Sequence, residues 1–283
     1  MLIRILAVLC CLVYSVWGQT NNFFIQGSDP QFGMYAKDQN FVQETANFEF
    51  FIANVNRLQP MFAVICGDLI NKTGDSAQIA EYHRIAGKLN PAIKLYSVAG
   101  NHDVGNEPTP ERLAAYRKNF GMDWYSFQET GIYGIVLNSS VIAFPAKVQS
   151  EAAKQEQWLR EELEKAKLSG RTIVIFQHIP WFLSNPDEPD QYFNIIMPIR
   201  AKYLKLFAES GVRYIFAGHY HRNAEGTGAA NLAMITTGPI GMPIGPDSSG
   251  FRIVTLKGGE LQQQYYGLGN IPNTYPPPPP TVH

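Results

Sequence analysis

The sequence predicts an α/β (α+β) fold in which two mixed β-sheets pack face to face between outer helices, as a four-layer sandwich. From residue 23 to residue 217, short apolar segments alternate with segments of helical periodicity, which is typical of strands joined by helices. Three further strand-like segments then follow without a helix between them. The 283 residues are 45% hydrophobic, which is enough for one large domain with a substantial core.

The first half of the chain alternates regularly between the two kinds of segment. Continuous apolar runs predict strands over residues 23–26, 61–66, 93–98 and 132–137. Helices are expected over residues 40–58, 75–89 and 109–121. The first of these has apolar residues at helical spacing, whereas Asp75 or Ser76 caps the second and Thr109 caps the third, just before Pro110.

The second half begins with the same alternation and then changes to strands alone. Helices are expected over residues 150–169 and 198–210, because a glycine follows each of them. Strands are expected over residues 172–176, 212–217, 232–237, 251–256 and 261–266. Gly258-Gly259 predicts a hairpin between the last two, and the polar, acidic segment 184–191 is predicted to be an exposed loop near the site described below.

The two ends of the chain differ in composition from the domain expected over residues 19–268. Arg4 precedes an uncharged, mostly apolar run that ends near Gly18, so residues 1–18 are predicted to be a cleaved secretory signal peptide. This predicts a secreted or secretory-pathway protein without a stable membrane anchor after cleavage, or a cytoplasmic one if this interpretation is wrong. Residues 269–283 form a proline-rich tail, extended or disordered, in which Pro276 to Pro280 offer a site for a polyproline-binding partner.

Charge and cysteine content exclude some classes of function. The formal net charge of −1 provides no basic field, so we expect no nucleic-acid partner. Removal of the signal peptide leaves Cys66 as the one remaining cysteine, which excludes an internal disulfide and predicts a buried apolar side chain. Asn71 and Asn138 begin glycosylation sequons, and the sequence leaves open whether either is used.

Polar side chains with metal-ligating groups come directly after the predicted strands. They are Asp29, Asp68, Asn101, His102, His178, His219 and His221. Ligands of α/β sheets collect beyond the carboxyl ends of the strands, so these side chains are expected to converge. Carboxylate, amide and imidazole groups together favour divalent cations, which predicts a two-metal hydrolytic site.

In order and spacing, these motifs resemble those of the calcineurin-like metallophosphoesterase superfamily. The motifs are Asp29, Gly67-Asp68, Gly100-Asn101-His102-Asp103, His178 and Gly218-His219-Tyr220-His221. The resemblance extends over residues 23–266 and implies the metallophosphoesterase fold. It also implies that Asp68 bridges two divalent cations, whose identity as Mn, Mg, Fe or Zn is left open. Asp29 and His221 would complete the first metal site, and Asn101, His178 and His219 the second.

The resemblance further implies hydrolysis of a phosphoric ester. The detailed motifs narrow this activity to that of a serine/threonine-protein phosphatase. Hydroxide held between the cations is expected to attack phosphorus, while His102 protonates the leaving oxygen. Asp103, beside it, is the second candidate catalytic residue. The substrate would be a phosphorylated protein or a small phosphoester.

Two positions depart from the pattern of the superfamily. The first motif usually has Asp-x-His, and here Gln31 replaces the histidine as an uncertain ligand. Because an amide carbonyl binds metal more weakly than imidazole, the first site should hold metal less tightly or favour a harder ion such as Mg or Mn. Asn71 stands where protein phosphatases of this superfamily have an acid that orients the catalytic histidine, and Lys72 stands in place of the arginine that follows.

No motif identifies the groups that bind the substrate phosphate. Asn138, Arg222 and Asn223 are candidates by their closeness to the motifs alone. A phosphodiesterase or nucleotidase acting on small phosphate esters is an alternative on the same scaffold. The residues that line the pocket, and not the metal ligands, determine which ester is the substrate. A second alternative is a non-catalytic binding protein that has lost the first metal through Gln31.

Overall fold

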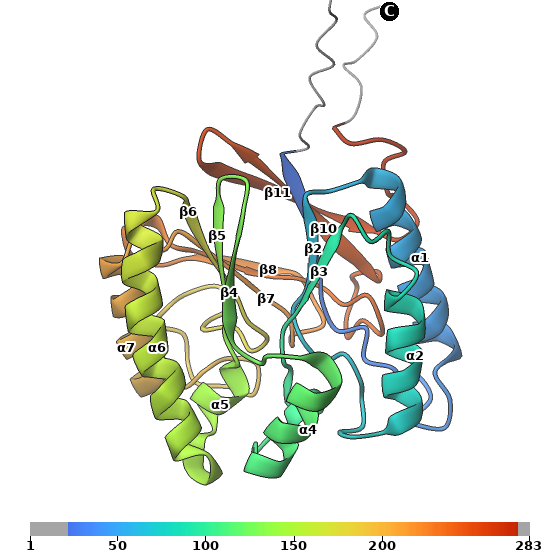
Figure 1. Ribbon diagram of the computed structural model, residues 1–283, viewed down its shortest axis with the longest axis horizontal. Helices are drawn as coiled ribbons and strands as arrows, with labels where there is room; N and C mark the ends of the chain where they lie inside the picture. Colours follow the sequence, from blue (N-terminus) through green and yellow to red (C-terminus); the bar gives the residue numbers. More distant parts are fainter. Residues whose placement is uncertain (1–21, 277–283) are drawn as a thin grey trace, which may run out of the picture.

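The computed structural model describes residues 22–276, and within this range the chain folds into four layers. Two sheets lie against each other, with α1 and α2 covering one sheet and α6 and α7 covering the other (Figure 1). The predicted sandwich of two mixed sheets flanked by helices is therefore confirmed. The predicted signal peptide, residues 1–18, and most of the proline run, residues 277–280, lie outside the described residues.

The first sheet has five strands in the order β11-β10-β1-β2-β3. Its strands are β1 (Phe23–Gly27), β2 (Phe62–Ile65), β3 (Lys94–Ser97), β10 (Gly250–Lys257) and β11 (Glu260–Gly267). β1, β2 and β3 are parallel, with Ile25 opposite Ala63, whereas β10 runs antiparallel to β1 and forms a hairpin with β11. The carboxyl ends of the three parallel strands therefore lie at the same edge.

The second sheet has six strands in the order β4-β5-β6-β7-β9-β8. Its strands are β4 (Tyr125–Glu129), β5 (Ile132–Val136), β6 (Thr172–Phe176), β7 (Tyr214–Ala217), β8 (Ala224–Thr227) and β9 (Ala233–Thr236). The four central strands are parallel, and the edge strands β4 and β8 are each antiparallel to their neighbour.

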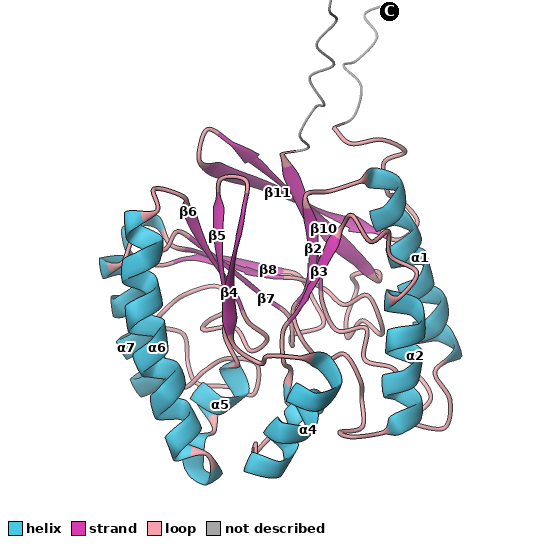
Figure 2. Cartoon of the chain, viewed as in Figure 1, coloured by secondary structure: helices cyan, strands magenta, loops and turns pink. Residues whose placement is uncertain are grey.

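Helices cover the outer faces and connect the strands (Figure 2). The α-helices are α1 (Val42–Leu58), α2 (Ser76–Ala86), α3 (Asn101–Val104), α4 (Pro110–Phe120), α5 (Ser139–Ala143), α6 (Gln149–Leu168) and α7 (Met197–Glu209). Two short 3₁₀ turns, η1 (Pro145–Lys147) and η2 (Ala229–Asn231), complete the set for the described residues. Asp75 caps α2 by accepting from the N–H groups of Ala77 and Gln78, as its position in the sequence predicts.

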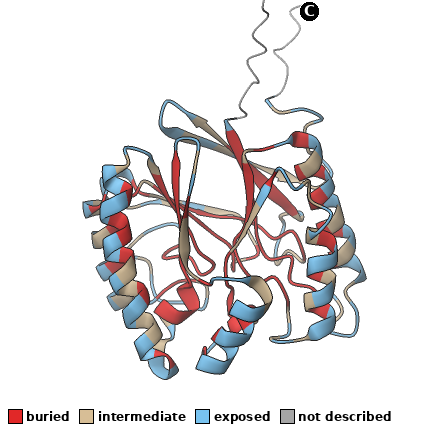
Figure 3. Cartoon of the chain, in the orientation of Figure 1, coloured by how far each residue is buried: buried red, intermediate tan, exposed pale blue. Residues whose placement is uncertain are grey.

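Three hydrophobic clusters fill the spaces between the four layers (Figure 3). Side chains along a strand alternate between faces, so Phe23 and Ile25 pack toward α1 while Phe24 packs toward the second sheet. Between the sheets, the Phe24 ring lies 4.7 Å from that of Phe62 and 5.8 Å from that of Phe176. This aromatic packing fixes the relative position of the two sheets, and with it the relative position of the loops at their ends.

Besides the two 3₁₀ turns, four short elements were not predicted from the sequence: β4, β8, α3 and α5. β4 and β8 are the two edge strands of their sheet, and along each of them most side chains are only partly buried or exposed. An edge strand buries little apolar surface and therefore carries a weak sequence signal. The helices α3 and α5 have four and five residues, which is too short for a helical period to be visible.

Part of the predicted proline-rich tail lies on the domain. Ile271 and Tyr275 pack against the cluster beneath α1, and the Tyr275 ring lies 4.7 Å from that of Phe23. Arg57 of α1 donates to the carbonyl oxygen of Pro272 at 2.9 Å. The chain therefore stays in contact with the first sheet up to about residue 275. Within residues 22–276, no helix is both long enough and apolar enough to cross a membrane.

Candidate metal centre

The candidate ligands lie just beyond the carboxyl ends of five parallel strands, three from the first sheet and two from the second. Asp29 follows β1, Asp68 follows β2 and Asn101 follows β3, whereas His178 follows β6 and His219 and His221 follow β7. All six side chains are buried. Because both sheets contribute, the centre depends on the packing between them as much as on either sheet.

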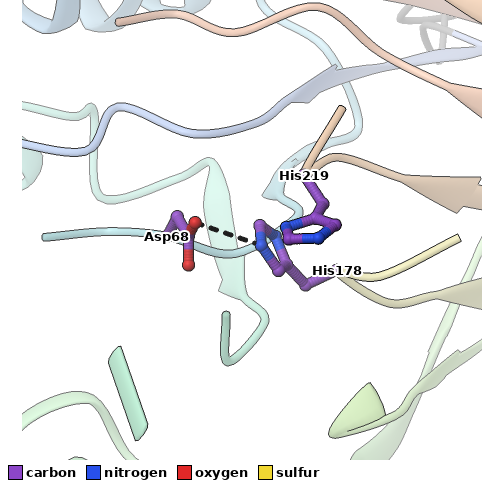
Figure 4. A group of neighbouring side chains, drawn as sticks. All are labelled: Asp68, His178 and His219. Carbon is purple, nitrogen blue, oxygen red and sulfur yellow. Dashed lines mark ion pairs between the residues drawn. The ribbon is translucent and has the colours of Figure 1, made fainter. Parts of the chain in front are cut away.

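Two groups of ligand atoms are close enough to bind metal ions. The first ligand group is Asp29, Asp68 and His221, and the second is Asp68, His178 and His219; within each group the ligand atoms lie within 4.8 Å of one another. Figure 4 shows the second group, with His178 and His219 facing Asp68. Asp68 belongs to both groups, which is the arrangement expected of a bridging carboxylate.

Asn101 lies beside the second ligand group, and the backbone N–H of Gln31 donates to the carbonyl oxygen of Asp68 at 2.9 Å. The Oδ1 atom of Asn101 is 2.9 Å from Nε2 of His178, the same nitrogen that lies 3.1 Å from Oδ2 of Asp68. The Gln31 amide donates from Nε2 to Oδ1 of Asn71 at 3.1 Å, while its buried Oε1 has no hydrogen-bond partner among the described residues. A buried carbonyl oxygen without a donor fits a site that receives a cation. The donor set as a whole therefore fits divalent metal.

Every histidine of the centre has one ring nitrogen bound by a backbone carbonyl. The contacts join His178 Nδ1 to Cys66 (2.8 Å), His219 Nε2 to Tyr192 (3.1 Å), His221 Nδ1 to Met242 (2.5 Å) and His102 Nδ1 to Asn71 (2.6 Å). A carbonyl only accepts, so each of these nitrogens carries the proton. When such a ring is neutral, its other nitrogen keeps a lone pair free for a cation or a proton.

The backbone at the ligands adopts conformations that non-glycine residues rarely take. Asp29, Gln31, Asp68, His219 and His221 all have positive φ angles, between 39° and 69°. Such strain persists only where the surrounding structure enforces it, and it is concentrated at functional sites. The strain thus gives independent support to a functional role for these loops.

Two glycines of the motifs are required by close approach between loops. A Cβ atom on Gly218 would lie 2.4 Å from Oδ2 of Asp29, and one on Gly100 would lie 2.1 Å from the backbone nitrogen of Asp68. Any side chain at these positions would push the ligand loops apart. The glycines that precede Asn101 and His219 in the sequence therefore serve the packing of the centre.

Charges within the centre act strongly on one another. Burial alone would raise the pKa of Asp68, but His178 and His102 outweigh it and hold that pKa below its ordinary value. Burial, together with the charge of His178, lowers the pKa of His219 to about 4. An ionised Asp68 beside a neutral His219 is the state in which both side chains can bind a cation.

His102 lies next to the ligands. The group that orients its ring differs from the one that its motif predicts. Its backbone N–H donates to Oδ1 of Asp68 at 2.8 Å, and Thr73 donates to its carbonyl oxygen at 2.7 Å. The Asn71 side chain takes no part in holding the ring. Instead, the backbone carbonyl of Asn71 accepts the Nδ1 proton and replaces the acid expected at this position.

The contacts of Asp103 are those of a positioning residue, in contrast to the catalytic role expected from the sequence. Its carboxylate accepts the backbone N–H groups of Leu69 (2.9 Å), Ile70 (3.2 Å) and Gly100 (2.8 Å). Burial raises the pKa of Asp103 to about 8, and the charge of Asp68 adds to this increase. Asp103 therefore joins the loop that holds Asp68 to the loop that holds Asn101 and His102.

The three candidate substrate-binding residues are largely occupied by structural contacts. Asn138 is buried, caps α5 through the Val141 N–H and donates to Asp123 at 2.9 Å. Asn223 donates to Asp247 and accepts from Gly238 and Arg252. These contacts give both asparagines structural roles, and their part in substrate binding stays a prediction. Arg222 donates to the carbonyl oxygen of Ile244 and lies over the Tyr220 ring, 5.2 Å from its centroid.

One residue at the centre was missed entirely. Tyr192 lies just beyond the loop predicted over residues 184–191, with its ring 4.9 Å from that of His219 and its carbonyl oxygen on the same histidine. It is 62% exposed, which is unusual for a large ring in contact with a buried centre. The adjacent aromatic residues Tyr192 and Phe193 at the end of a polar loop were the signal available in the sequence.

Comparison with known proteins places the chain among phosphoesterases. The family model described as calcineurin-like phosphoesterase matches residues 27–223. The chain is 35% identical over 265 residues to serine/threonine-protein phosphatase CPPED1 of Bos taurus, covering 88% of this chain and 84% of that protein. It is 36% identical over 266 residues to the Homo sapiens protein of the same name, with the same coverage. The fold resembles a dimetal phosphatase from Danio rerio with a TM-score of 0.64 and 15% identity, over 87% of this chain and 96% of that one.

Proposed function

Because this chain belongs to the calcineurin-like phosphoesterase family, we propose that it is a metal-dependent phosphatase acting on phosphoserine and phosphothreonine in proteins. The observation that carries the proposal is the pair of ligand groups sharing Asp68, with the His102 backbone bound to the same carboxylate. The names of relatives that are 33–37% identical support the protein-phosphatase assignment. The family resemblance predicted from the motifs is confirmed.

The residues of this chain supply binding, orientation and proton transfer. Asp29, Asp68, His221 and Gln31 would hold one divalent cation, and Asp68, Asn101, His178 and His219 a second. When bound, such cations activate water and neutralise the negative charge of the phosphoryl group. The protein contributes a set of ligands whose ring orientations are already fixed by backbone carbonyls, so little reorganisation is needed.

His102 is the group we assign to the leaving oxygen. Its Nδ1–H donates to the carbonyl oxygen of Asn71 at 2.6 Å, so a second proton on this ring resides on Nε2. Transfer of that proton to the departing seryl or threonyl oxygen avoids an unstable alkoxide. His102 thus acts as general acid, and Asn71 holds the ring in position for it.

A substrate and metal panel tests the proposal. The chain from residue 19 onward is stripped of metal, reloaded with Mg, Mn, Zn or Fe, and assayed on a phosphopeptide, a nucleoside monophosphate and a cyclic nucleotide. We expect turnover of the phosphopeptide, lost on chelation and restored by one of the metals. Preference for the cyclic nucleotide or the nucleotide would favour the phosphodiesterase or nucleotidase alternative, and fewer than two metals per chain without turnover would favour the binding protein.

His102→Ala separates catalysis from metal binding. We expect kcat to fall by about a hundredfold to ten-thousandfold while the metal content stays the same, because the His102 side chain is a proton donor in this scheme. His83→Ala is the matched control, since His83 lies exposed on α2 and packs against Phe120 away from the ligands. Full activity of His102→Ala would remove the mechanism.

A secretory location for this phosphatase rests on the composition of residues 1–18, and we retain it as part of the proposal. Its test is the N-terminus of the protein purified from culture medium. A chain that begins near Gln19 supports secretion, whereas a chain found in the cytoplasm with Met1 intact contradicts it.

A further inference from the structure

The loop between β6 and α7 is held rigidly although most of it is polar. The Glu188 carboxylate accepts the N–H groups of Leu183 (2.8 Å) and Ser184 (3.0 Å) and the amide of Asn194 (2.7 Å). Buried Arg200 donates to the carbonyl oxygens of Pro186, Glu188 and Ile195, all at 2.8–2.9 Å. The side chains of Glu188 and Arg200 thus fix the loop. Residues 192 and 193, which belong to it, therefore have a defined position.

This rigid loop places two aromatic rings over the second ligand group. The Tyr192 ring lies 4.9 Å and the Phe193 ring 5.7 Å from the ring of His219. Phe193 also packs against Tyr220 at 5.1 Å, which anchors it within the motif that carries His219. Tyr192, in contrast, is 62% exposed and separates the buried histidine from solvent.

Tyr192 meets the metal centre through its ring and its backbone, because the ring lies 4.9 Å from that of His219 and the carbonyl oxygen accepts from the same histidine at 3.1 Å. Burial raises the pKa of Tyr192 and the charge of Asp68 adds to the increase, whereas an interaction with the Asn101 side chain opposes it. A hydroxyl group in this place is a hydrogen-bond donor beside the position that a bound phosphoryl group would occupy.

We propose that Tyr192 is the substrate-positioning residue of this centre, donating a hydrogen bond from its hydroxyl to a phosphoryl oxygen of the bound ester. The inference rests on the proposed function, because it requires a phosphate ester at the metal centre. It fills the place left open by Asn138 and Asn223, whose amides are held by Asp123 and Asp247. Tyr192 is accessible and also touches the ligands.

The test compares Tyr192→Phe with the wild-type protein. The substitution keeps the ring on His219 and the backbone carbonyl that accepts from it, and removes the hydroxyl alone. We expect the Kd of inorganic phosphate for the metal-loaded protein, measured by calorimetry, to rise about tenfold or more, as for loss of a hydrogen bond to a charged group. KM for a phosphopeptide should rise in parallel, and metal content should not change. Tyr266→Phe is the matched control, because its hydroxyl binds Gln264 on β11.

The outcomes distinguish failure of this inference from failure of the proposed function. Unchanged phosphate affinity and unchanged KM in Tyr192→Phe would overturn the role of Tyr192, as would a wild-type protein that binds no phosphate when loaded with metal. A wild-type protein that binds phosphate but hydrolyses none of the esters would reject the phosphatase function. In that case the phosphate Kd of Tyr192→Phe still determines whether Tyr192 contacts the anion.

Discussion

The two ligand groups share Asp68 but differ in the chemistry and the cover of their remaining ligands. The first group adds one carboxylate, Asp29, and one imidazole, His221, with the Gln31 amide nearby. The second adds two imidazoles, His178 and His219, with the Asn101 amide against His178. Oxygen ligands favour hard ions such as Mg and Mn, whereas imidazole suits Zn and Fe. Under the proposed function, the two ligand groups would therefore differ in the cation that each prefers.

The two ligand groups also differ in the residues that lie against them. Tyr192 and Phe193 lie over the second group, held there by Glu188 and Arg200. Gln31, whose backbone N–H donates to the carbonyl oxygen of Asp68 at 2.9 Å, binds the side chain of Asn71. Under the proposed role of Tyr192, the second group would form the substrate side of the centre.

Asp68→Asn should have the largest effect, because it removes the one carboxylate that both groups share. A neutral amide at this position leaves two cations repelling each other without a bridging charge. We expect activity to fall at least about a thousandfold and metal content to fall at both groups. A variant that keeps two metals per chain, measured by elemental analysis, would show that the groups do not share Asp68.

His221→Ala and His178→Ala form a matched pair that tests whether the groups are separable. Each variant removes one imidazole from a single group, so each should lose one of two cations and about a hundredfold in activity. The ion retained should also differ, with the harder one kept in His178→Ala. Metal counted per chain after dialysis measures this, and loss of both ions in each variant would mean that the centre assembles only as a unit.

Gln31→His should strengthen metal binding at the first group, whereas the substitutions above weaken metal binding. Replacing the unpaired Gln31 carbonyl by an imidazole should strengthen the first group for Zn by about tenfold, while Gln31→Ala weakens it. Competition with a chelating dye gives the Zn Kd of both variants. Equal Kd values for wild type, Gln31→His and Gln31→Ala would show that position 31 lies outside the first coordination sphere.

Glu188→Gln should have the smallest effect, because it loosens only the loop over the second group. Burial would raise the pKa of Glu188, but Asn194 and the N–H groups of Ser184 and Leu183 lower it to about 2. A lowered pKa means that the stabilisation is present above the unfolded value of about 4.3 and is lost as pH falls toward 2. The side chain is partly exposed, so we expect less than about 1 kcal/mol at pH 7.

Urea unfolding of Glu188→Gln and wild type at pH 7 and at pH 3 measures this contribution. The difference in unfolding free energy should shrink at the lower pH. Glu209→Gln is the control, since Glu209 is exposed and its contact with Lys205 is 3.8 Å long. A difference that stays constant with pH would show that the charge of Glu188 does not stabilise the loop.

Much of the fold followed from the sequence because its central strands are continuous apolar runs. β2, β6 and β7 are buried along nearly their whole length, so the strand signal there is strong. The edge strands β4 and β8 lack that burial and were missed. The same rule explains most of the centre, because Asp68, the three histidine ligands and Asp29 stand directly after buried strands, whereas Asn101 follows the partly exposed β3.

The sequence by itself determined which donor types stand at which strand ends, and hence that metal-dependent phosphoester chemistry was the function to expect. Tertiary structure alone decided how those donors are oriented. The carbonyls of Cys66, Asn71 and Met242 hold the histidine rings, and Tyr192 reaches the centre from a distant loop. Every residue has a backbone carbonyl, so no side-chain pattern marks the few that accept these protons, and only the packing of the two sheets selects them.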